Sequence, residues 1–234
     1  MNIKNLLREI RNIFAYREMK IGNMDYEEYW TSREDDVFKE GSDNTEKIIS
    51  DIIEKNSTVM DIGCGDGRLL NRLRAEKRAH GEGIDVSATA AKRCREKGMK
   101  CTVVDIQKKF RLSKKYDYIV ITDVLEHIPN PEFVMENLRD SFNKKLIISL
   151  PNIGMVFNRA RLLFGKFPLE WYWHPGEHIR HWTLADIKWW IRSNKNFGCR
   201  IAGIYSNTGI PLLRKLWPSM FSAGFVVVLE RDIA

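Results

Sequence analysis

The 234-residue chain lacks several features that define large protein classes. Its four cysteines form no C-x-x-C pair, so their spacing indicates neither a disulfide framework nor a zinc site. The longest apolar stretch, residues 217–229, is interrupted by Pro218 and is shorter than the ~20 residues that a membrane-spanning helix needs. Residues 1–20 carry charges every few positions and lack the apolar core of a signal peptide. These absences predict a cytoplasmic protein with reduced thiols.

The composition is that of a folded globular protein. Hydrophobic residues make up 44% of the chain and charged residues 29%, which excludes an intrinsically disordered or collagen-like chain. The length suits one full domain with added segments. Lys and Arg number 38 against 31 Asp and Glu, a formal net charge of +7. Such an excess favours association with anionic partners, but it does not indicate a fold or a chemistry.

Short apolar runs alternate with helical patterns from residue 57 onward. Strands are expected near residues 58–61, 83–85, 100–104, 116–121, 146–150, 200–205 and 225–230. Because most of these runs are continuously apolar, they indicate a parallel sheet covered by helices on both faces. The connection between the last two strands leaves no room for a crossover helix, which favours a hairpin with one antiparallel strand at the sheet edge. The prediction is an α/β fold: a three-layer, Rossmann-like, mostly parallel sheet whose last strand is antiparallel.

Two regions lie outside this pattern. Residues 1–40 are expected to form an N-terminal helical extension, and residues 41–234 one domain with an aromatic insertion at about 152–182. Within the extension, residues 2–20 have the apolar spacing of a basic amphipathic helix. Three interpretations of that helix stay open: it docks on the domain, it contacts an anionic membrane surface peripherally, or it binds a partner protein.

One segment carries most of the chemical information, Asp61-Ile-Gly-Cys-Gly-Asp-Gly67. A strand ends there, the glycines allow a tight turn, and the next helix begins with free N–H groups. Asp85 follows Gly63 by 22 residues and closes the second strand, where a carboxylate can bind ribose hydroxyls. A dinucleotide site would need a glycine where Arg68 stands. Asp61 suits an ammonium group better than a diphosphate, which favours S-adenosylmethionine as the cofactor.

With Asp105 and the segment Asp123-Val-Leu-Glu-His-Ile128, this motif resembles the class I S-adenosylmethionine-dependent methyltransferases. The resemblance implies a seven-stranded sheet with an antiparallel last strand. It also implies that Asp61 holds the amino group of the cofactor, Asp85 its ribose hydroxyls and Asp105 its adenine amino group. The cofactor-binding positions implied in this way are Asp61, Gly63, Cys64, Gly65, Gly67, Asp85, Val86, Asp105, Ile106, Thr122 and Asp123.

A finer resemblance is to the MetW-like branch of these proteins. It rests on Ser149-Leu-Pro-Asn152, on Arg159-x-Arg161 and on a His-Trp-Thr sequence before the helix that Thr183 is expected to cap. The two resemblances together imply an enzyme, a methyltransferase, as the leading function, with a regulatory function as the alternative. The first is methyl transfer to an O or N atom of a small metabolite or glycan-type acceptor. The second is a non-catalytic, regulatory association with a biosynthetic acyltransferase. Nucleic acid is not expected as a substrate, because Asp123-Val-Leu-Glu126 replaces the Pro-Pro loop of enzymes that methylate flipped bases.

Histidines and tryptophans are the candidates for acceptor chemistry. His127, near the expected cofactor cleft, is either a catalytic base or a loop residue that orients the backbone. The candidate substrate residues, from an insertion rich in both types, are Trp171, Trp173, His174, His178 and His181. The alternative is that these aromatic residues only anchor the insertion. We expect no metal site, because Pro175-Gly176 interrupts the histidine spacing.

Overall fold

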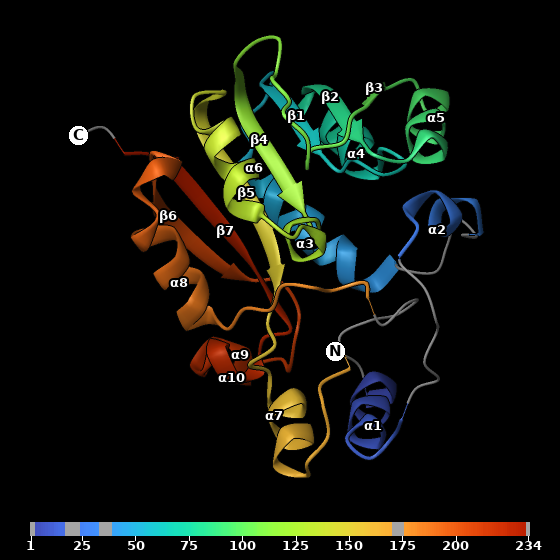
Figure 1. The fold of residues 1–234 in the computed structure, drawn as a ribbon, viewed down its shortest axis with the longest axis vertical. Coiled ribbons are helices and arrows are strands. Elements are labelled where there is room, and N and C mark those ends of the chain that lie inside the picture. The colour runs from blue at the N-terminus through green and yellow to red at the C-terminus, as the bar shows by residue number, and fades with distance from the viewer. Residues whose placement is uncertain (1–2, 17–23, 33–38, 170–175, 233–234) are drawn as a thin grey trace.

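Seven strands form one mixed sheet in the order β3-β2-β1-β4-β5-β7-β6 (Figure 1). The protein is represented by a computed structural model that describes residues 3–16, 24–32, 39–169 and 176–232. The strands are β1 (Thr58–Ile62), β2 (His80–Asp85), β3 (Lys100–Val103), β4 (Tyr116–Thr122), β5 (Phe142–Pro151), β6 (Cys199–Ser206) and β7 (Gly224–Arg231). The pairs β1–β2, β1–β4, β2–β3 and β4–β5 are parallel, and β7 is antiparallel to both neighbours. The predicted mostly parallel sheet with an antiparallel last strand is therefore confirmed.

The expectation that the antiparallel strand lies at the sheet edge is wrong. β7 is inserted between β5 and β6, and β6 forms the edge. The burial of the two strands explains this order. Phe225 to Leu229 of β7 are all at most 2% exposed, which requires neighbours on every side, whereas Arg200 and Tyr205 of β6 are accessible to solvent.

Helices cover both faces of the sheet. They are α1 (Ile3–Asn12), α2 (Tyr26–Ser32), α3 (Lys39–Ile52), α4 (Arg68–Lys77), α5 (Ala88–Glu96), α6 (Pro131–Leu138), α7 (Val156–Leu163), α8 (Leu184–Ser193), α9 (Leu213–Leu216) and α10 (Pro218–Phe221), with 3-10 turns η1 (Leu125–His127) and η2 (Lys195–Phe197). The side chains of α6 and α8 pack on one face, and those of α3, α4 and α5 pack on the other. Thr183 caps α8 through a complete capping box with Asp186, as expected.

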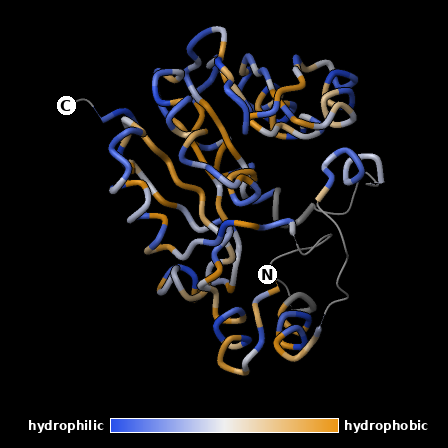
Figure 2. Tube along the Cα trace, viewed as in Figure 1, coloured by the Kyte–Doolittle hydropathy of each residue, from blue (hydrophilic) through white to orange (hydrophobic). Residues whose placement is uncertain are grey.

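The continuous apolar runs of the sequence correspond to strands buried on both faces. In β4, Ile119 and Ile121 belong to the core beneath α6 and α8, whereas Tyr118 and Val120 belong to the core beneath α3 and α4. Figure 2 shows this concentration of hydrophobic residues along the central strands. All four cysteines are free and buried. Along the ranges that the structure describes, no helix is both long and apolar enough to cross a membrane.

A buried asparagine joins the end of β5 to the connection between β6 and β7. The side-chain amide of Asn152 donates hydrogen bonds to the carbonyl groups of Ser219 (3.1 Å) and Ser222 (2.8 Å). Its Oδ1 accepts a hydrogen bond from the N–H of Gly154 (3.0 Å). Asn152 is 1% exposed, so water cannot replace these partners. This residue sets where the chain leaves the sheet towards α7.

We predict that Asn152→Ala lowers the free energy of unfolding by about 2–3 kcal/mol, because the substitution leaves buried carbonyl and N–H groups without partners. Asn137→Ala is a matched control. The side chain of Asn137 makes one hydrogen bond inside α6, to the carbonyl of Phe133 (2.8 Å), and its loss should cost about 1 kcal/mol or less. Urea denaturation of the three proteins measures both effects. Equal losses in the two variants would contradict the special role of Asn152.

Candidate functional site

The loop between β1 and α4 adopts a backbone that only glycine enters freely. Gly63, Gly65 and Gly67 have φ angles of +73°, +52° and +76°. A Cβ atom at Gly65 would lie 2.7 Å from Cζ2 of Trp30, and one at Gly63 would collide with the side chain of Val124. The loop is therefore enclosed by α2 on one side and by the turn after β4 on the other. Larger side chains would be excluded by both backbone conformation and space.

Asp61, near the end of β1, is buried without a hydrogen bond to one of its oxygens. The residue is 1% exposed, and within the described ranges its Oδ1 has no hydrogen-bond partner. Burial raises the pKa of this carboxyl well above its usual range, and the nearby Cys94, Asp85 and Glu46 add to the effect. An ammonium group would supply the missing partner and favour the charged carboxylate. This arrangement fits the predicted role of Asp61.

Asp85, at the end of β2, organises the turn that follows it. Its Oδ2 accepts a hydrogen bond from the N–H of Gly65 (2.8 Å), and its Oδ1 accepts one from the N–H of Ser87 (2.9 Å). Burial raises the pKa of Asp85, while these backbone N–H groups act in the opposite direction. Each carboxylate oxygen has a second lone pair, which leaves acceptor capacity for a ribose hydroxyl.

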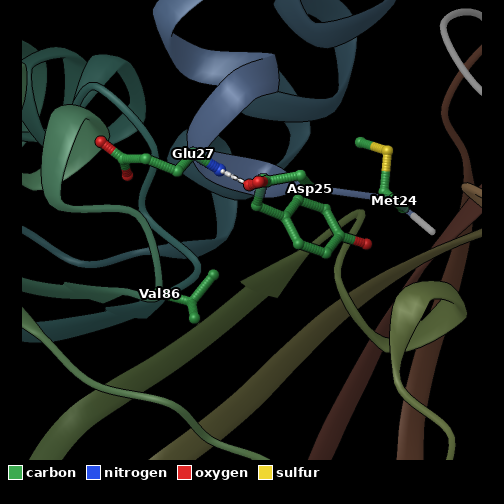
Figure 3. Close-up of a pocket in the computed structure, with 5 residues that line it drawn as sticks. Met24, Asp25, Glu27 and Val86 are labelled. Atoms are coloured by element: carbon green, nitrogen blue, oxygen red, sulfur yellow. Dashed lines mark hydrogen bonds between the residues drawn. The ribbon is translucent and has the colours of Figure 1, made fainter. Parts of the chain in front are cut away.

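A cavity of about 450 Å³ lies between the start of α2 and Val86, the residue after Asp85 (Figure 3). It is lined by Met24, Asp25, Tyr26, Glu27 and Val86. Val86, which the family resemblance places against the adenine, is 47% exposed. An exposed apolar side chain at a cavity offers a surface for an aromatic ring. The cavity therefore adjoins one of the predicted cofactor positions, Val86.

Asp105 and Ile106 lie beyond β3. The Oδ1 of Asp105 accepts a hydrogen bond from the N–H of Gln107 (3.0 Å), and its Oδ2 lies 3.2 Å from Nζ of Lys108. Ile106 is buried in the core beneath α6. A second cavity, of about 280 Å³, is lined by residues that include Gln107 and Ile128. These placements are compatible with the adenine contacts implied by the resemblance, which stay a prediction.

Asp123 turns the chain sharply after Thr122, the last residue of β4. Its φ of +52° is an uncommon conformation for a residue other than glycine. The buried Ser149 holds it there: the hydroxyl oxygen accepts from the N–H of Asp123 (3.0 Å), and the hydroxyl donates to Oδ1 of Asp123 (2.6 Å). The segment Ser149-Leu-Pro-Asn152 thus supplies two polar side chains, Ser149 and Asn152, that shape this edge of the sheet.

Folding brings His127 and His178 together. Their ring centroids are 4.9 Å apart, and the ring of Tyr26 meets His127 edge-on at 5.8 Å. The Nδ1 of His127 is hydrogen-bonded to the carbonyl oxygen of Glu177, so this nitrogen carries the proton in the neutral ring. Burial, with His127 and His181 nearby, lowers the pKa of His178 to about 3. His178 is therefore neutral at physiological pH, and its Nδ1 is buried with no hydrogen-bond partner in the described structure.

Of the other predicted acceptor residues, only His181 lies within the described ranges. His181 is exposed, and its ring centroid lies 6.2 Å from that of Phe167. Trp171, Trp173 and His174 lie outside the described residues. Trp182, from the same insertion, is buried against Trp190 in the core (ring centroids 5.5 Å apart), so part of the aromatic bias anchors the insertion.

Three cysteines meet beneath the glycine loop. The Sγ atoms of Cys64 and Cys101 are 3.2 Å apart, and Cys94 completes the group. The buried side chain of Cys64 points towards these two cysteines, so this loop residue can offer a ligand only its backbone atoms. The thiols lie within 4.8 Å of one another, as do ligand atoms of Glu126, His127 and His178. The expectation of no metal site stays a prediction.

The sequence reasoning missed the role of α2. Glu27 of α2 accepts hydrogen bonds from the hydroxyl of Ser87 (2.6 Å) and the N–H of Thr89 (3.1 Å), at the N-terminus of α5. Trp30, one turn further, lies against Gly65. The helix is therefore fastened across the glycine loop, beside α5 (Figure 1). The only signal for this role was the acidic and aromatic character of residues 25–33.

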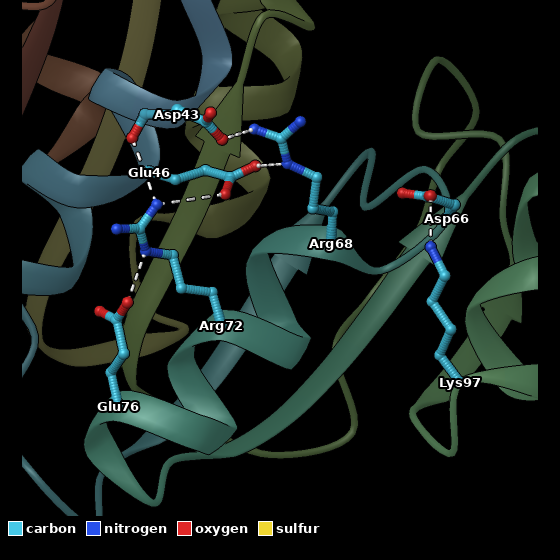
Figure 4. Close-up of polar contacts among 7 residues, drawn as sticks. All are labelled: Asp43, Glu46, Asp66, Arg68, Arg72, Glu76 and Lys97. Atoms are coloured by element: carbon cyan, nitrogen blue, oxygen red, sulfur yellow. Dashed lines mark hydrogen bonds and ion pairs between the residues drawn. The ribbon is translucent and has the colours of Figure 1, made fainter. Parts of the chain in front are cut away.

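Ion pairs anchor both ends of the glycine loop (Figure 4). Arg68, the first residue of α4, lies 2.8 Å from Glu46 and 2.5 Å from Asp43, both on α3. On the other side, Lys97 at the end of α5 pairs with Asp66 in the loop. The arginine that occupies the position of a dinucleotide-site glycine therefore has a structural role, because its long side chain ties α4 to α3.

Comparison with known proteins places these features in a family. The family model described as "Methionine biosynthesis protein MetW" matches residues 43–229. The chain is 26% identical over 162 residues to a bifunctional methionine biosynthesis protein MetXA/MetW of Rhodopirellula baltica; this match covers 61% of the chain but only 25% of that protein. It is 27% identical over 199 residues to a ubiquinone biosynthesis O-methyltransferase of Glaesserella parasuis, covering 74% of the chain and 78% of the relative.

The solved structures show the same fold. Magnesium protoporphyrin IX methyltransferase from Synechocystis, with bound SAH, superposes with a TM-score of 0.61 at 18% identity, over 97% of this chain and 95% of that one. The small RNA methyltransferase HEN1 superposes with a TM-score of 0.64 at 19% identity, over 87% of this chain and 27% of that one. The fold is therefore that of the class I S-adenosylmethionine-dependent methyltransferases.

We predict that Asp61→Asn stabilises the cofactor-free protein at neutral pH while weakening its binding of S-adenosylhomocysteine. The raised pKa means that folded Asp61 retains its proton where the unfolded chain has released it, so the parent protein loses stability as the pH rises above about 4. The Asp61→Asn variant does not lose stability in this way, because asparagine carries no titratable proton at this position. Urea denaturation at about pH 5 and about pH 8 should therefore show a stability gap that widens with pH.

Calorimetry should show at least about tenfold weaker binding of S-adenosylhomocysteine to Asp61→Asn, because a charge-assisted hydrogen bond is lost. Asp66→Asn is the control in the same loop. Asp66 is paired with Lys97, so its substitution should produce no stability gain that grows with pH. A gap for Asp61→Asn that stays constant with pH would contradict the buried, protonated state of Asp61.

Proposed function

We propose that this chain, which belongs to the MetW family, transfers a methyl group from S-adenosylmethionine to an O or N atom of a small metabolite or glycan-type acceptor. Its relatives and structural neighbours include methyltransferases, one of them solved with bound SAH. The chain spans about a quarter of the bifunctional relative and most of the ubiquinone-biosynthesis relative, so the acceptor is part of the proposal.

The buried oxygen of Asp61 carries the cofactor assignment. An unpaired buried carboxylate is costly, and the ammonium group of the cofactor would remove that cost. Asp85, whose carboxylate binds the N–H of Gly65, offers acceptor atoms beside the glycine loop. Val86 offers an exposed apolar surface next to it in the sequence. Together these residues match the order of groups along S-adenosylmethionine, from amino acid through ribose to adenine.

His127 supplies the acceptor chemistry in this proposal. When bound, the cofactor offers a methyl group on a positively charged sulfur, which an O or N lone pair can attack directly. An acceptor O–H or N–H group that takes this methyl group would have to give up its proton to a base of the protein. Because Nδ1 of His127 is committed to the carbonyl of Glu177, its Nε2 holds the lone pair that can take that proton.

His178 and Tyr26 position this base. His178 stays neutral beside His127, so it adds no positive charge that would oppose protonation of His127. Burial and the carboxylates of Glu126 and Glu177 raise the pKa of Tyr26, so Tyr26 keeps its proton and can donate a hydrogen bond. In this proposal His127 is the group that takes up the proton of the acceptor.

A regulatory function is the second candidate, and one observation favours it. In the Rhodopirellula baltica relative, a MetW segment and a MetXA segment occupy one chain. By analogy, this protein would bind a separate biosynthetic acyltransferase. Stoichiometric co-purification of such an enzyme with the tagged protein, without methyl incorporation from labelled S-adenosylmethionine into any extract fraction, would favour this alternative.

We predict that His127→Ala reduces methyl transfer at least about 100-fold, while affinity for S-adenosylhomocysteine changes less than about threefold. His80→Ala is the control, because His80 is an exposed histidine at the opposite, amino-terminal end of β2 and should be neutral for both quantities. The assay follows label from S-adenosylmethionine into a fractionated cell extract. Full turnover by His127→Ala would contradict the base assignment and leave His127 a backbone-orienting residue.

A further inference from the structure

The structure exposes an apolar surface formed by two segments that are far apart in the sequence. Its members are Leu7, Ile10 and Phe14, on and just after α1, and Leu162, Leu163, Phe164 and Phe167, at the end of α7. Their exposed fractions range from 45% for Ile10 to 82% for Leu163. We call this set the apolar tip, because α1 and α7 project together at one end of the molecule (Figure 1). Exposed apolar side chains gathered at one end of a molecule are typical of an interaction site.

Arg161 holds the two segments of the tip together. Its guanidinium donates hydrogen bonds to four carbonyl groups, those of Asn12, Ile13, Ala15 and Phe167. Lys166 donates to the carbonyl of Phe14 (3.1 Å), and the rings of Phe14 and Phe164 lie 5.1 Å apart. Arg161 is only 4% exposed, so its guanidinium interacts with these carbonyl groups and is shielded from solvent. The tip is therefore one built surface rather than two loose helices.

The charge around the tip is mainly positive. Within residues 3–16 and 156–167, the sequence has one acidic residue, Glu9, against the basic residues Lys4, Arg8, Arg11, Arg159, Arg161 and Lys166. Glu9 is already partnered by Arg8 at 3.6 Å. Arg8 and Arg11 are exposed on the same helix as Leu7 and Ile10. Exposed leucine and phenylalanine with a basic border match the apolar interior and anionic headgroups of a bilayer surface.

We propose that the apolar tip docks on an anionic lipid bilayer surface. The leucine and phenylalanine side chains would enter the headgroup boundary, and the arginines would lie among lipid phosphates. A second copy of this chain fits less well, because an isologous contact would bring two basic borders together. The amphipathic pattern of residues 2–20 left membrane contact as one of three interpretations, and this inference selects it. The structure adds the end of α7 to the contact surface, a segment that the pattern of residues 2–20 does not include.

Docking in this orientation would also concern the candidate active site. The carboxyl ends of β4 and β5 point towards the end of the molecule that carries α1 and α7 (Figure 1). His127 follows β4, so the membrane-bound protein would present this edge to acceptors held at the lipid surface. That consequence rests on the proposed function, whereas the docking itself does not.

The test is co-sedimentation of the full-length protein with vesicles of phosphatidylglycerol and phosphatidylcholine, or of phosphatidylcholine alone. We expect binding to the anionic vesicles that is at least about tenfold stronger and that weakens with added salt. Leu163→Ser combined with Phe167→Ser should lower the partition coefficient about tenfold or more. Arg8→Gln combined with Arg11→Gln should lower it about 25-fold, since each basic residue near such a surface contributes about fivefold.

Trp189→Ser is the matched control, because Trp189 is 68% exposed on α8, away from the tip, and its substitution should leave vesicle binding unchanged. All altered side chains are exposed, and thermal denaturation should confirm that each variant remains folded. Absence of binding to anionic vesicles would overturn the proposal, as would equal binding to phosphatidylcholine alone or parental binding by both tip variants. If the protein does not bind vesicles but forms a dimer that the Leu163 and Phe167 substitutions dissociate, the apolar tip is a self-association surface and the proposal is overturned. Vesicle binding is measured without methyl transfer, so its failure is distinct from failure of the proposed function.

Discussion

The carboxylate of Asp85 is the interaction on which the rest of the site depends. It binds the N–H groups of Gly65 and Ser87, and so joins the glycine loop to the turn that begins α5. Ser87 in turn caps α5 through Ala90 and donates its hydroxyl to Glu27. Through these few hydrogen bonds, one buried side chain determines the positions of β2, α5, the loop and the covering helix α2.

Burial disfavours the charged forms of the two acidic side chains at the centre of this region. Asp61 and Asp85 are both buried, and burial is the largest influence raising the pKa of each. The neighbouring groups that act on Asp61 are themselves acidic or thiols, so they add to the destabilisation of its charged form. The basic residues beside the glycine loop, Arg68 and Lys97, pair with Asp43, Glu46 and Asp66 and not with Asp61. The cofactor proposed for this site would bring an ammonium group and a positively charged sulfur to these carboxyl groups.

Much of the fold could be predicted from local patterns. The loop glycines, the cap at Thr183 and the buried strand β4 each follow from the chemistry of a few consecutive residues, and the structure contains all three. The order of the last two strands could not be predicted in this way. Both segments have strand-like composition, and the choice of β7 for the inner position depends on how completely its two faces are covered.

The sequence by itself therefore determined the kind of cofactor site, because the turn, its glycines and its carboxylates lie within short segments whose backbone preferences are local. Only the tertiary structure decided what surrounds that site. His127 meets His178, Cys64 meets Cys101, and Arg161 meets the end of α1 across separations of about 40 to 150 residues. No local pattern encodes such contacts, since they arise when helices and strands pack to bury their apolar faces. The acceptor side of the site and the apolar tip are products of that packing.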